Sequence, residues 1–475
     1  MGRLPYATTG RRPAESTPGE MRGTPPTDGD GAMETLTAAR AQMEVSLAFH
    51  MVFAALGIGM PLLMVIAEAL WLRTGHAHYR HLARKWAKAT ALAFAIGAVS
   101  GTALSFELGL LWPRFMAFAG GIIGPAFALE GYAFFLEAIF LGLYLYGWEK
   151  LSPRAHLLAG VAVAASGMIS GVLVVAANAW MQQPAGFVLV DGQATRVTPL
   201  APFLSRAWGV MAVHSTLSCY IATGFAAAGV YAVGMLRGRR DPYHRAGLSL
   251  ALAVATAAAA LQPLSGHFSA DHTARHQPLK LAAYEAHFHT TRGAAEIIGG
   301  IPDVEARTVH GAIRIPRLLS LLAFADPGAE VKGLDAFPRE LWPNVVVAHL
   351  AFQVMIGCGV ALIAVGAWFW HARWRRRDPG RWLLRALAAA SPLGIVALEA
   401  GWIVTEVGRQ PWIVQGVMKT ADGVTDAPSV PATFFGFSVL YLGLGIALAL
   451  LLRHLATGAP PAGSAADARE VAHAR

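Results

Sequence analysis

Nine long apolar runs constrain the fold of this chain more than any other feature of its sequence. They cover approximately residues 43–72, 87–111, 122–147, 155–180, 208–236, 246–266, 344–371, 382–406 and 432–455. About 20 apolar residues are enough for a helix to cross the hydrocarbon core of a bilayer. A helix also satisfies its own backbone hydrogen bonds in lipid. The sequence therefore predicts an all-α, polytopic integral membrane protein with nine transmembrane helices.

The charged residues lie between these runs rather than on one binding face. Hydrophobic residues make up 55% of the chain and charged residues 14%, against about 25% charged residues in a soluble domain. The net charge of +9 comes mostly from the links, so we expect no nucleic-acid partner. The two cysteines, Cys219 and Cys358, lie in separate apolar runs, which excludes a disulfide framework.

The positions of the basic residues predict the orientation. Arg and Lys are concentrated after the first, fifth and seventh runs: Arg73, Arg80, Arg84, Lys85; Arg237, Arg239, Arg240, Arg245; Arg373, Arg375, Arg376, Arg377 and Arg381. The links after the second, fourth and eighth runs carry far fewer. By the positive-inside rule, the N-terminus lies outside and the C-terminus is cytoplasmic. The segment 267–343 then faces outward.

We divide the chain into a helical unit, 35–455, and two tails. Residues 1–34 are rich in Pro, Gly, Thr and Arg and contain no apolar run, so we expect disorder or an over-extended reading frame. Met33 is a natural start, and residues 1–32 are expected to have no role in activity. Residues 456–475 are expected to form a disordered tail.

Two carboxylates end the eighth run, in the segment EAGWIVTEVGRQPW (residues 399–412). Glu399 and Glu406 are two helical turns apart, so they share one face about 10 Å apart. A carboxylate in an apolar span is costly unless it has a partner or a function. Arg409 and Trp412 follow, and a salt-bridged helix end with an interfacial tryptophan is an ordinary explanation that the spacing alone leaves open.

Other polar residues lie at unusual places in or between the runs. They are His50, Glu130, Glu137, His214, Met355, Lys280 and Glu285. A single buried histidine is more often part of the core, and a buried methionine usually fills a gap. Glu130 and Glu137 are again seven residues apart and share a face, so protons could pass between them through water. Lys280 and Glu285 could belong to a solvated amphipathic loop.

The segment EAGWIVTEVGRQPW resembles subunit I of the cytochrome bd quinol oxidases. RAQMEVSLAFH around His50, ANAWMQQP at 177–184, QPLKLAAYEAHFHT at 277–290 and IPD at 301–303 also match that family. The resemblance extends from about Arg40 to Leu455, and nine spans with an outer segment after the sixth match the family layout.

The resemblance implies roles for each candidate residue. His50 and Glu406 would be ligands of the two oxygen-site hemes, with Glu399 nearby and Arg409 beside heme propionates. His214 and Met355 would ligate a low-spin b heme, a ligand pair that raises the reduction potential. Glu130 and Glu137 would deliver protons. Lys280 and Glu285 would bind quinol and accept its protons.

We therefore expect a terminal oxidase subunit that oxidises ubiquinol or menaquinol, reduces O2 to water and separates charge without pumping. Its cofactors would be two b hemes and a heme d or third heme b, held non-covalently because no C-x-x-C-H motif occurs. Expected partners are subunit II, small single-helix accessory subunits and the quinol pool of a bacterial cytoplasmic (inner) membrane.

Several positions depart from the family pattern. Many relatives place eight rather than seven residues between the glutamates equivalent to Glu130 and Glu137. FELGLLW stands where FQFGTNW is common, so Glu107 and Leu111 replace an amide and an asparagine. Gln353 stands where some members have arginine. Two alternative functions are a diheme b-type anchor of a quinone-linked dehydrogenase, which generally uses histidine pairs, and a proton-coupled secondary transporter, which often shows an internal repeat.

Overall fold

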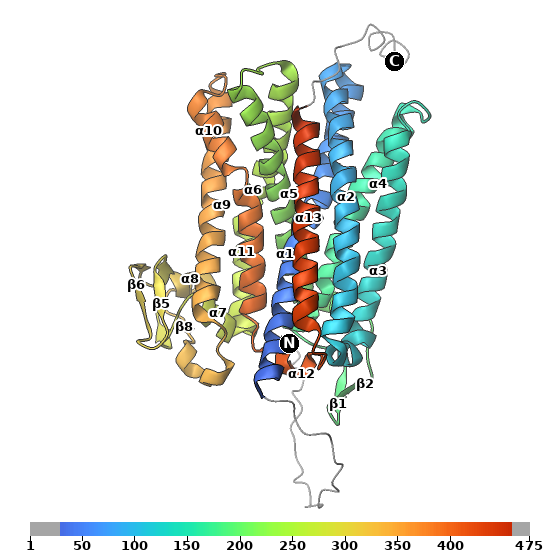
Figure 1. Ribbon diagram of the computed structural model, residues 1–475. Helices are drawn as coiled ribbons and strands as arrows, with labels where there is room; N and C mark the ends of the chain where they lie inside the picture. Colours follow the sequence, from blue (N-terminus) through green and yellow to red (C-terminus); the bar gives the residue numbers. More distant parts are fainter. Residues whose placement is uncertain (1–28, 458–475) are drawn as a thin grey trace, which may run out of the picture.

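Long helices that run side by side make up most of the computed structural model, which describes residues 29–457 (Figure 1). The long helices are α1 (Gly29–Thr74), α2 (Ala77–Leu111), α3 (Pro113–Tyr146), α4 (Pro153–Gln182), α5 (Arg206–Leu236), α6 (Pro242–His276), α9 (Val345–Trp374), α10 (Arg381–Ala390), α11 (Leu393–Val407) and α13 (Val430–Thr457). Nine helical stretches within residues 29–457 are long and apolar enough to cross a membrane. The predicted all-α class and the nine spans are confirmed.

Capping side chains and prolines at or outside the ends of the apolar runs determine where several helices begin. Ser152, Asp241 and Asn344 cap α4, α6 and α9 by accepting hydrogen bonds from backbone N–H groups, the usual role of these side chains. Proline occupies the first turn of α4 and α6, where its missing N–H costs nothing. The helices consequently extend beyond the predicted spans. α1 begins at Gly29, so residues 29–34 of the predicted tail are helical, while residues 1–28 lie outside the described part.

The predicted span 382–406 is interrupted rather than continuous. α10 ends at Ala390 and α11 begins at Leu393, and Pro392 lies in the break. Proline lacks the N–H of a helical hydrogen bond and its ring clashes with the preceding turn. Ser391 at the break packs against Gly229 of α5, where a Cβ would have no room.

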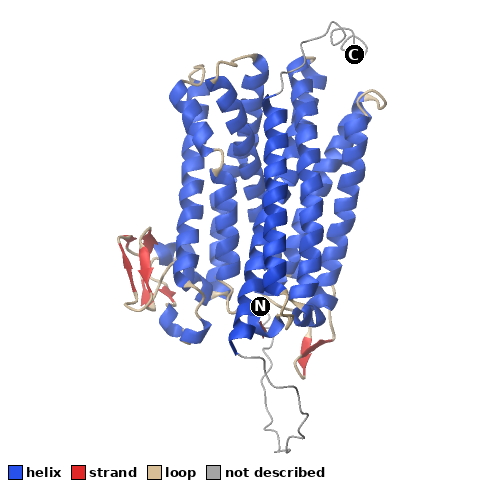
Figure 2. Ribbon diagram, viewed as in Figure 1, coloured by secondary structure: helices blue, strands red, loops and turns tan. Residues whose placement is uncertain are grey.

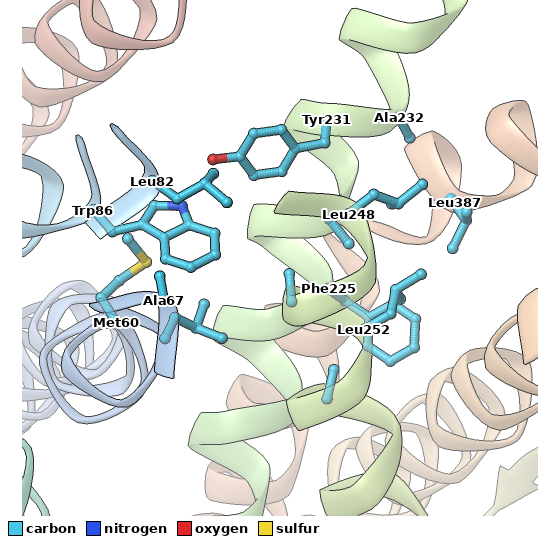
Figure 3. Packing of buried hydrophobic residues seen from close by; sticks show 14 of the residues in the cluster. Met60, Ala67, Leu82, Trp86, Phe225, Tyr231, Ala232, Leu248, Leu252 and Leu387 are labelled. Atoms are coloured by element: carbon cyan, nitrogen blue, oxygen red, sulfur yellow. The ribbon is translucent and has the colours of Figure 1, made fainter. Parts of the chain in front are cut away.

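The largest apolar core joins α1, α2, α5, α6 and α10. Figure 3 shows Met60, Trp86, Phe225, Leu248 and Leu387 converging from these helices. Phe225 and Leu248 are almost fully inaccessible to solvent. This packed core fixes the helices at one end of the bundle and leaves the polar candidate residues to the middle and the other end.

Short strands and helices lie at the end of the bundle opposite α10 (Figure 2). Segment 267–343, which we call the outer segment, contains two short α-helices and six short strands. They are α7 (Pro278–Tyr284), α8 (Leu318–Phe324) and strands β3 (Thr291–Arg292), β4 (Glu296–Ile298), β5 (Ile301–Asp303), β6 (Thr308–His310), β7 (Ile313–Ile315) and β8 (Glu330–Val331). Strands β1 (Val188–Val190) and β2 (Gln193–Thr195) form a separate hairpin, and β9 (Trp412–Val414) pairs with β10 (Met418–Lys419). All five pairings are antiparallel and two-stranded. Sequence analysis did not predict these hairpins.

The two ends of the bundle agree with the predicted topology. The start of α1 lies at the same end as the outer segment, and the C-terminal end of α13 lies at the end that carries α10 (Figure 1). The basic links after α1, α5 and α9 belong to this second end. Which end faces the cytoplasm rests on the positive-inside rule.

Candidate functional site

Glu406 lies in the last turn of α11 within a network of charged and amide groups. Asn178 of α4 donates a hydrogen bond from Nδ2 to Glu406 Oε1 at 2.6 Å, and Arg409 Nη2 donates to Glu406 Oε2. The Arg409 side chain is only 4% exposed, and its Nε and Nη1 are buried without a hydrogen-bond partner among residues 29–457. Buried charged donors without acceptors are costly. An anionic group such as a heme propionate fits this position.

His50 on α1 is oriented by the neighbouring helix α2. Its Nδ1 lies 3.0 Å from Ser100 Oγ, and that hydroxyl lies 3.0 Å from the Ile96 carbonyl oxygen. If the hydroxyl donates to the carbonyl, Ser100 accepts a hydrogen bond from Nδ1–H, and Nε2 is then the unprotonated nitrogen that a metal ligand requires. A Cβ at position 101 would come within 2.9 Å of the His50 ring, so Gly101 gives this ring its space.

His214 on α5 has the same arrangement. Its Nδ1 lies 3.0 Å from Ser265 Oγ of α6, and Ser265 donates to the Gln262 carbonyl oxygen at 2.9 Å. Gln262 Nε2 is 3.1 Å from His214 Nε2, so an iron ion bound at this nitrogen would replace that hydrogen bond. The histidine therefore has an oriented ring and one replaceable polar contact.

Met355 lies on α9 and faces α11. A Cβ at Gly401 of α11 would come within 3.1 Å of Met355 Sδ. His214 of α5 and Met355 of α9 lie on different helices, and each would supply one side-chain ligand to a heme iron. Within residues 29–457, no three His, Cys, Asp or Glu side chains converge to hold a metal ion. A heme iron would need only single side-chain ligands from the protein, because the porphyrin would supply its other ligands.

Glu130 and Glu137 share the face of α3 that packs against α4, as predicted. Ser170 of α4 donates to Glu130 Oε1 at 2.8 Å, and the Glu137 carboxyl lies against Gly167 of the same helix. Glu137 is 5% exposed and its Oε1 has no hydrogen-bond partner in the described part of the chain. Glu399 on α11 likewise has a buried, unpartnered Oε1. Such oxygens can bind water or protons inside the membrane.

Lys280 and Glu285 come from α7 and its C-cap but have different neighbours. Lys280 Nζ donates to Gln182 Oε1 of α4, and its side chain contacts the position of Gly408. Burial and the nearby Arg409 lower the pKa of Lys280 to about 7, although Glu406 opposes this shift. The structure therefore places Lys280 beside the Glu406 network.

Glu285 meets a second carboxyl group. Its side chain is 4% exposed and hydrogen-bonds Glu296 of β4. Burial, and then the charge of Glu296, raise the pKa of Glu285 well above its ordinary value. Burial also raises the pKa of Glu296. Lys280 and Glu285 were both predicted to bind quinol, and in the structure each of them contacts different protein groups.

Helix α9 holds β4 next to Glu285. Gln353 accepts a hydrogen bond from Gly299 N at 2.8 Å and donates to the Ile297 carbonyl oxygen at 3.0 Å. The two ring nitrogens of His349 lie 2.9 Å from the Tyr284 carbonyl oxygen and 3.1 Å from that of Gly299. At Gln353, where some family members have arginine, this chain has an amide that fixes the backbone of the outer segment.

Sequence analysis missed the residues that orient the candidates. Asn178 and Gln182 are four residues apart on α4 and so share a face, which the segment ANAWMQQP could have indicated. Ser100 and Ser265 carried no signal, because a serine in an apolar helix usually bonds its own backbone. Glu296 could not be paired with Glu285 before β4 was known.

The chain was compared with known proteins. Residues 38–460 match the family model for cytochrome bd terminal oxidase subunit I. A putative cytochrome bd menaquinol oxidase subunit I from Bacillus subtilis is 36% identical over 426 residues, which cover 88% of this chain and 96% of that protein. Cytochrome bd ubiquinol oxidase subunit 1 of the same organism is 31% identical, with 90% and 95% covered.

A solved structure agrees with these sequence matches. The bd oxidase from Geobacillus thermodenitrificans matches with a TM-score of 0.85 and 36% identity, over 90% of this chain and 99% of that one. The family match, the relatives and the fold thus agree over nearly the whole described chain. The chain belongs to the cytochrome bd terminal oxidase subunit I family.

Proposed function

We propose which residues of this chain carry the quinol:oxygen oxidoreductase activity of its family. The chain is a terminal quinol oxidase subunit and a multi-pass protein of a bacterial inner membrane. His50 and Glu406 are the proposed iron ligands at the oxygen site, and His214 and Met355 are those of the low-spin heme. The main support is the buried Arg409 beside Glu406, whose two unpartnered nitrogens could bind an anion such as a heme propionate.

The family implies heme cofactors and a quinol substrate. We propose two b hemes with a heme d or a third heme b, and ubiquinol or menaquinol as the electron donor. When bound, the hemes supply electron transfer and the reduction of O2. Ser100 and Ser265 hold the two ligand imidazoles in orientation, and Gly401 leaves space for the Met355 sulfur.

Protons for water formation have a proposed route along α3 and α4. Glu137 and Glu130 lie on one face of α3, and Ser170 contacts the second of them. With the C-terminus cytoplasmic, protons enter from the cytoplasm while quinol protons leave on the outer side. Glu399, with its free buried oxygen, belongs to this proton-handling set. Charge is then separated across the membrane without a pump.

The exposed helix faces support a partner subunit within the membrane. Large apolar side chains are exposed along α2 and α3, among them Phe106, Leu110, Phe135 and Ile139. Only 17% and 22% of the residues in the most apolar stretches of α2 and α3 are buried within this chain. We propose that subunit II, and small single-helix subunits where present, cover part of this surface.

Replacing Glu285 tests the quinol site. Glu285→Gln keeps the shape of the side chain but cannot accept a proton, so quinol-driven oxygen consumption should fall about 100-fold. Oxygen consumption fed by an artificial donor that bypasses the outer segment should remain. Glu340→Gln, an exposed position in the same segment, is the matched control. Equal loss of both activities would show that Glu285 supports folding and not the quinol site.

A further inference from the structure

Glu296, the carboxyl neighbour of Glu285, has no function in the assignment given above. Glu285 follows α7, and Glu296 begins β4, which pairs antiparallel with β7. Each has one carboxyl oxygen, Oε2, that is buried and lacks a hydrogen-bond partner in the described part of the chain. The pair therefore combines one internal hydrogen bond with two unsatisfied acceptors.

The two carboxyl groups differ in their access to water. Glu285 is 4% exposed, whereas Glu296 is only half-buried. Ile315, the strand partner of Glu296, is 38% exposed, and Ile313 on the same strand is 66% exposed. Glu296 is thus covered by a single hairpin at the surface of the outer segment, and Glu285 lies behind it.

Within residues 29–457, neither carboxyl group forms an ion pair with a basic side chain. The Tyr284 hydroxyl is hydrogen-bonded to Thr273. The ring nitrogens of His349 lie near the carbonyl oxygens of Tyr284 and Gly299, not against either carboxyl group. Lys280 faces Gln182 instead. Two carboxyl groups in contact cannot both ionise readily, so the pair holds a shared proton.

We infer that Glu296 relays the proton of quinol from Glu285 to the water outside the membrane. This inference rests on the proposed quinol oxidation at Glu285. The O–H bond of quinol breaks and an O–H bond forms on Glu285, as Glu285 gives its own proton to the Glu296 carboxylate. Glu296 then releases that proton to water. Two such transfers accompany the loss of two electrons through the oxidase to O2, so protons and electrons balance.

The relay explains why a deeply buried carboxyl can serve a reaction that releases protons repeatedly. Glu285 alone would have to reach water through a covered site after each transfer. With Glu296 between it and the surface, Glu285 returns to its starting protonation state as soon as the proton has moved to Glu296. Glu296 acts through Glu285, so it is a positioning and relay residue, and quinol need not touch it.

The test compares Glu296→Gln with Glu296→Asp, Glu285→Gln and the control Glu340→Gln. Glu296→Gln should lower kcat with quinol about tenfold and change KM less than about twofold, with artificial-donor activity intact. Glu296→Asp, which restores a carboxylate, should recover most of the rate. Acetate should accelerate Glu296→Gln but leave wild type unchanged, because a small carboxylate can take the proton from Glu285.

The pH profile separates a relay from a structural role. Removing the charge of Glu296 lowers the pKa of Glu285, so the acid limb of the quinol-driven rate should move to lower pH in Glu296→Gln. An unchanged kcat and pH profile would overturn the inference, and so would a loss that acetate does not rescue. If Glu285→Gln is impaired while Glu296→Gln is normal, only the relay fails. If Glu285→Gln itself keeps full quinol activity, the proposed quinol site fails.

Discussion

Glu406 and Glu285 are both carboxyl groups at the end of the bundle that carries segment 267–343, but their surroundings differ. Glu406 receives hydrogen bonds from Asn178 on another helix and from the guanidinium of Arg409. Glu285 is hydrogen-bonded to a second carboxyl group, Glu296. A cation and an amide hold a carboxylate in place as a negatively charged ligand, whereas a second carboxyl holds a proton that can move.

The neighbouring groups of each glutamate therefore determine whether it acts as a fixed negative ligand or as a proton carrier. The partners of Glu406 come from α4 and from its own chain segment, which are parts of the helical bundle. The partner of Glu285 comes from a short strand that α9 fastens to the bundle. One site depends on helix packing and the other on the outer hairpins, so the two should respond separately to substitution.

The largest effect is expected at the Glu406 end. His50→Ala removes a proposed iron ligand, and Glu406→Gln removes the other. Since loss of even a supporting contact costs about 10–100-fold in a metal site, either variant should reduce oxygen consumption by more than about 100-fold with both donors. Carbon monoxide difference spectra should show depletion of the oxygen-reactive heme. Full carbon monoxide binding in His50→Ala would disprove that assignment.

A smaller loss of activity, with only the low-spin heme affected, is expected for a substitution at Met355 of α9. Met355→Leu keeps volume and apolarity but removes the sulfur that we assign as a ligand. The low-spin heme band should shift or disappear and quinol-driven turnover should fall at least about tenfold, while carbon monoxide binding remains. Met235→Leu, at a buried position of α5, is the control. An unchanged low-spin spectrum would mean that Met355 only packs.

The helical bundle was predictable because each span is encoded locally. Apolar runs gave nine spans, and the seven-residue spacing placed Glu130 and Glu137 on one face of α3. The break at Pro392 and the extension of α6 to His276 were missed, since apolar length alone does not mark caps and kinks.

The outer segment was less predictable because it depends on contacts between distant residues. Its strands are two or three residues long and pair across loops, too short for an alternating pattern to be recognised. The partner of Glu285 lies eleven positions away on such a strand, and its support comes from α9. The proposed roles of His50 and His214 came from family resemblance, and the structure adds the serine side chains that contact their rings.

A still smaller effect is expected where α9 holds the outer segment. Gln353→Leu removes two hydrogen bonds to the backbone around β4 and leaves Gly299 N and the Ile297 carbonyl without that partner, at about 1–3 kcal/mol for each unsatisfied group. The quinol KM should rise roughly fivefold, or about 1 kcal/mol, with artificial-donor activity unchanged. An equal loss of activity with both donors would instead show that Gln353 affects the helical bundle, and that the Glu406 and Glu285 regions do not respond separately.

The smallest effect concerns stability against pH. The pKa of Glu285 in the folded protein is raised above 4.5, so its contribution to stability is fully present below that pH and is lost as pH rises through the folded value. Glu285→Gln lacks this loss. Its midpoint of heat unfolding, relative to wild type, should therefore increase as the pH rises above about 5. A difference that does not change with pH would show that the carboxyl is ionised in the native state.

Helix α9 carries His349 and Gln353, which hold the outer segment, and Met355 follows two residues after Gln353. We therefore expect a molecule that displaces β4 to disturb the turn of α9 that carries Met355, the proposed ligand. The absorption band of the low-spin heme would then act as a built-in optical reporter of occupancy at the outer segment. Inhibitor affinities could be read from a static titration of the oxidase, without turnover and without an added label.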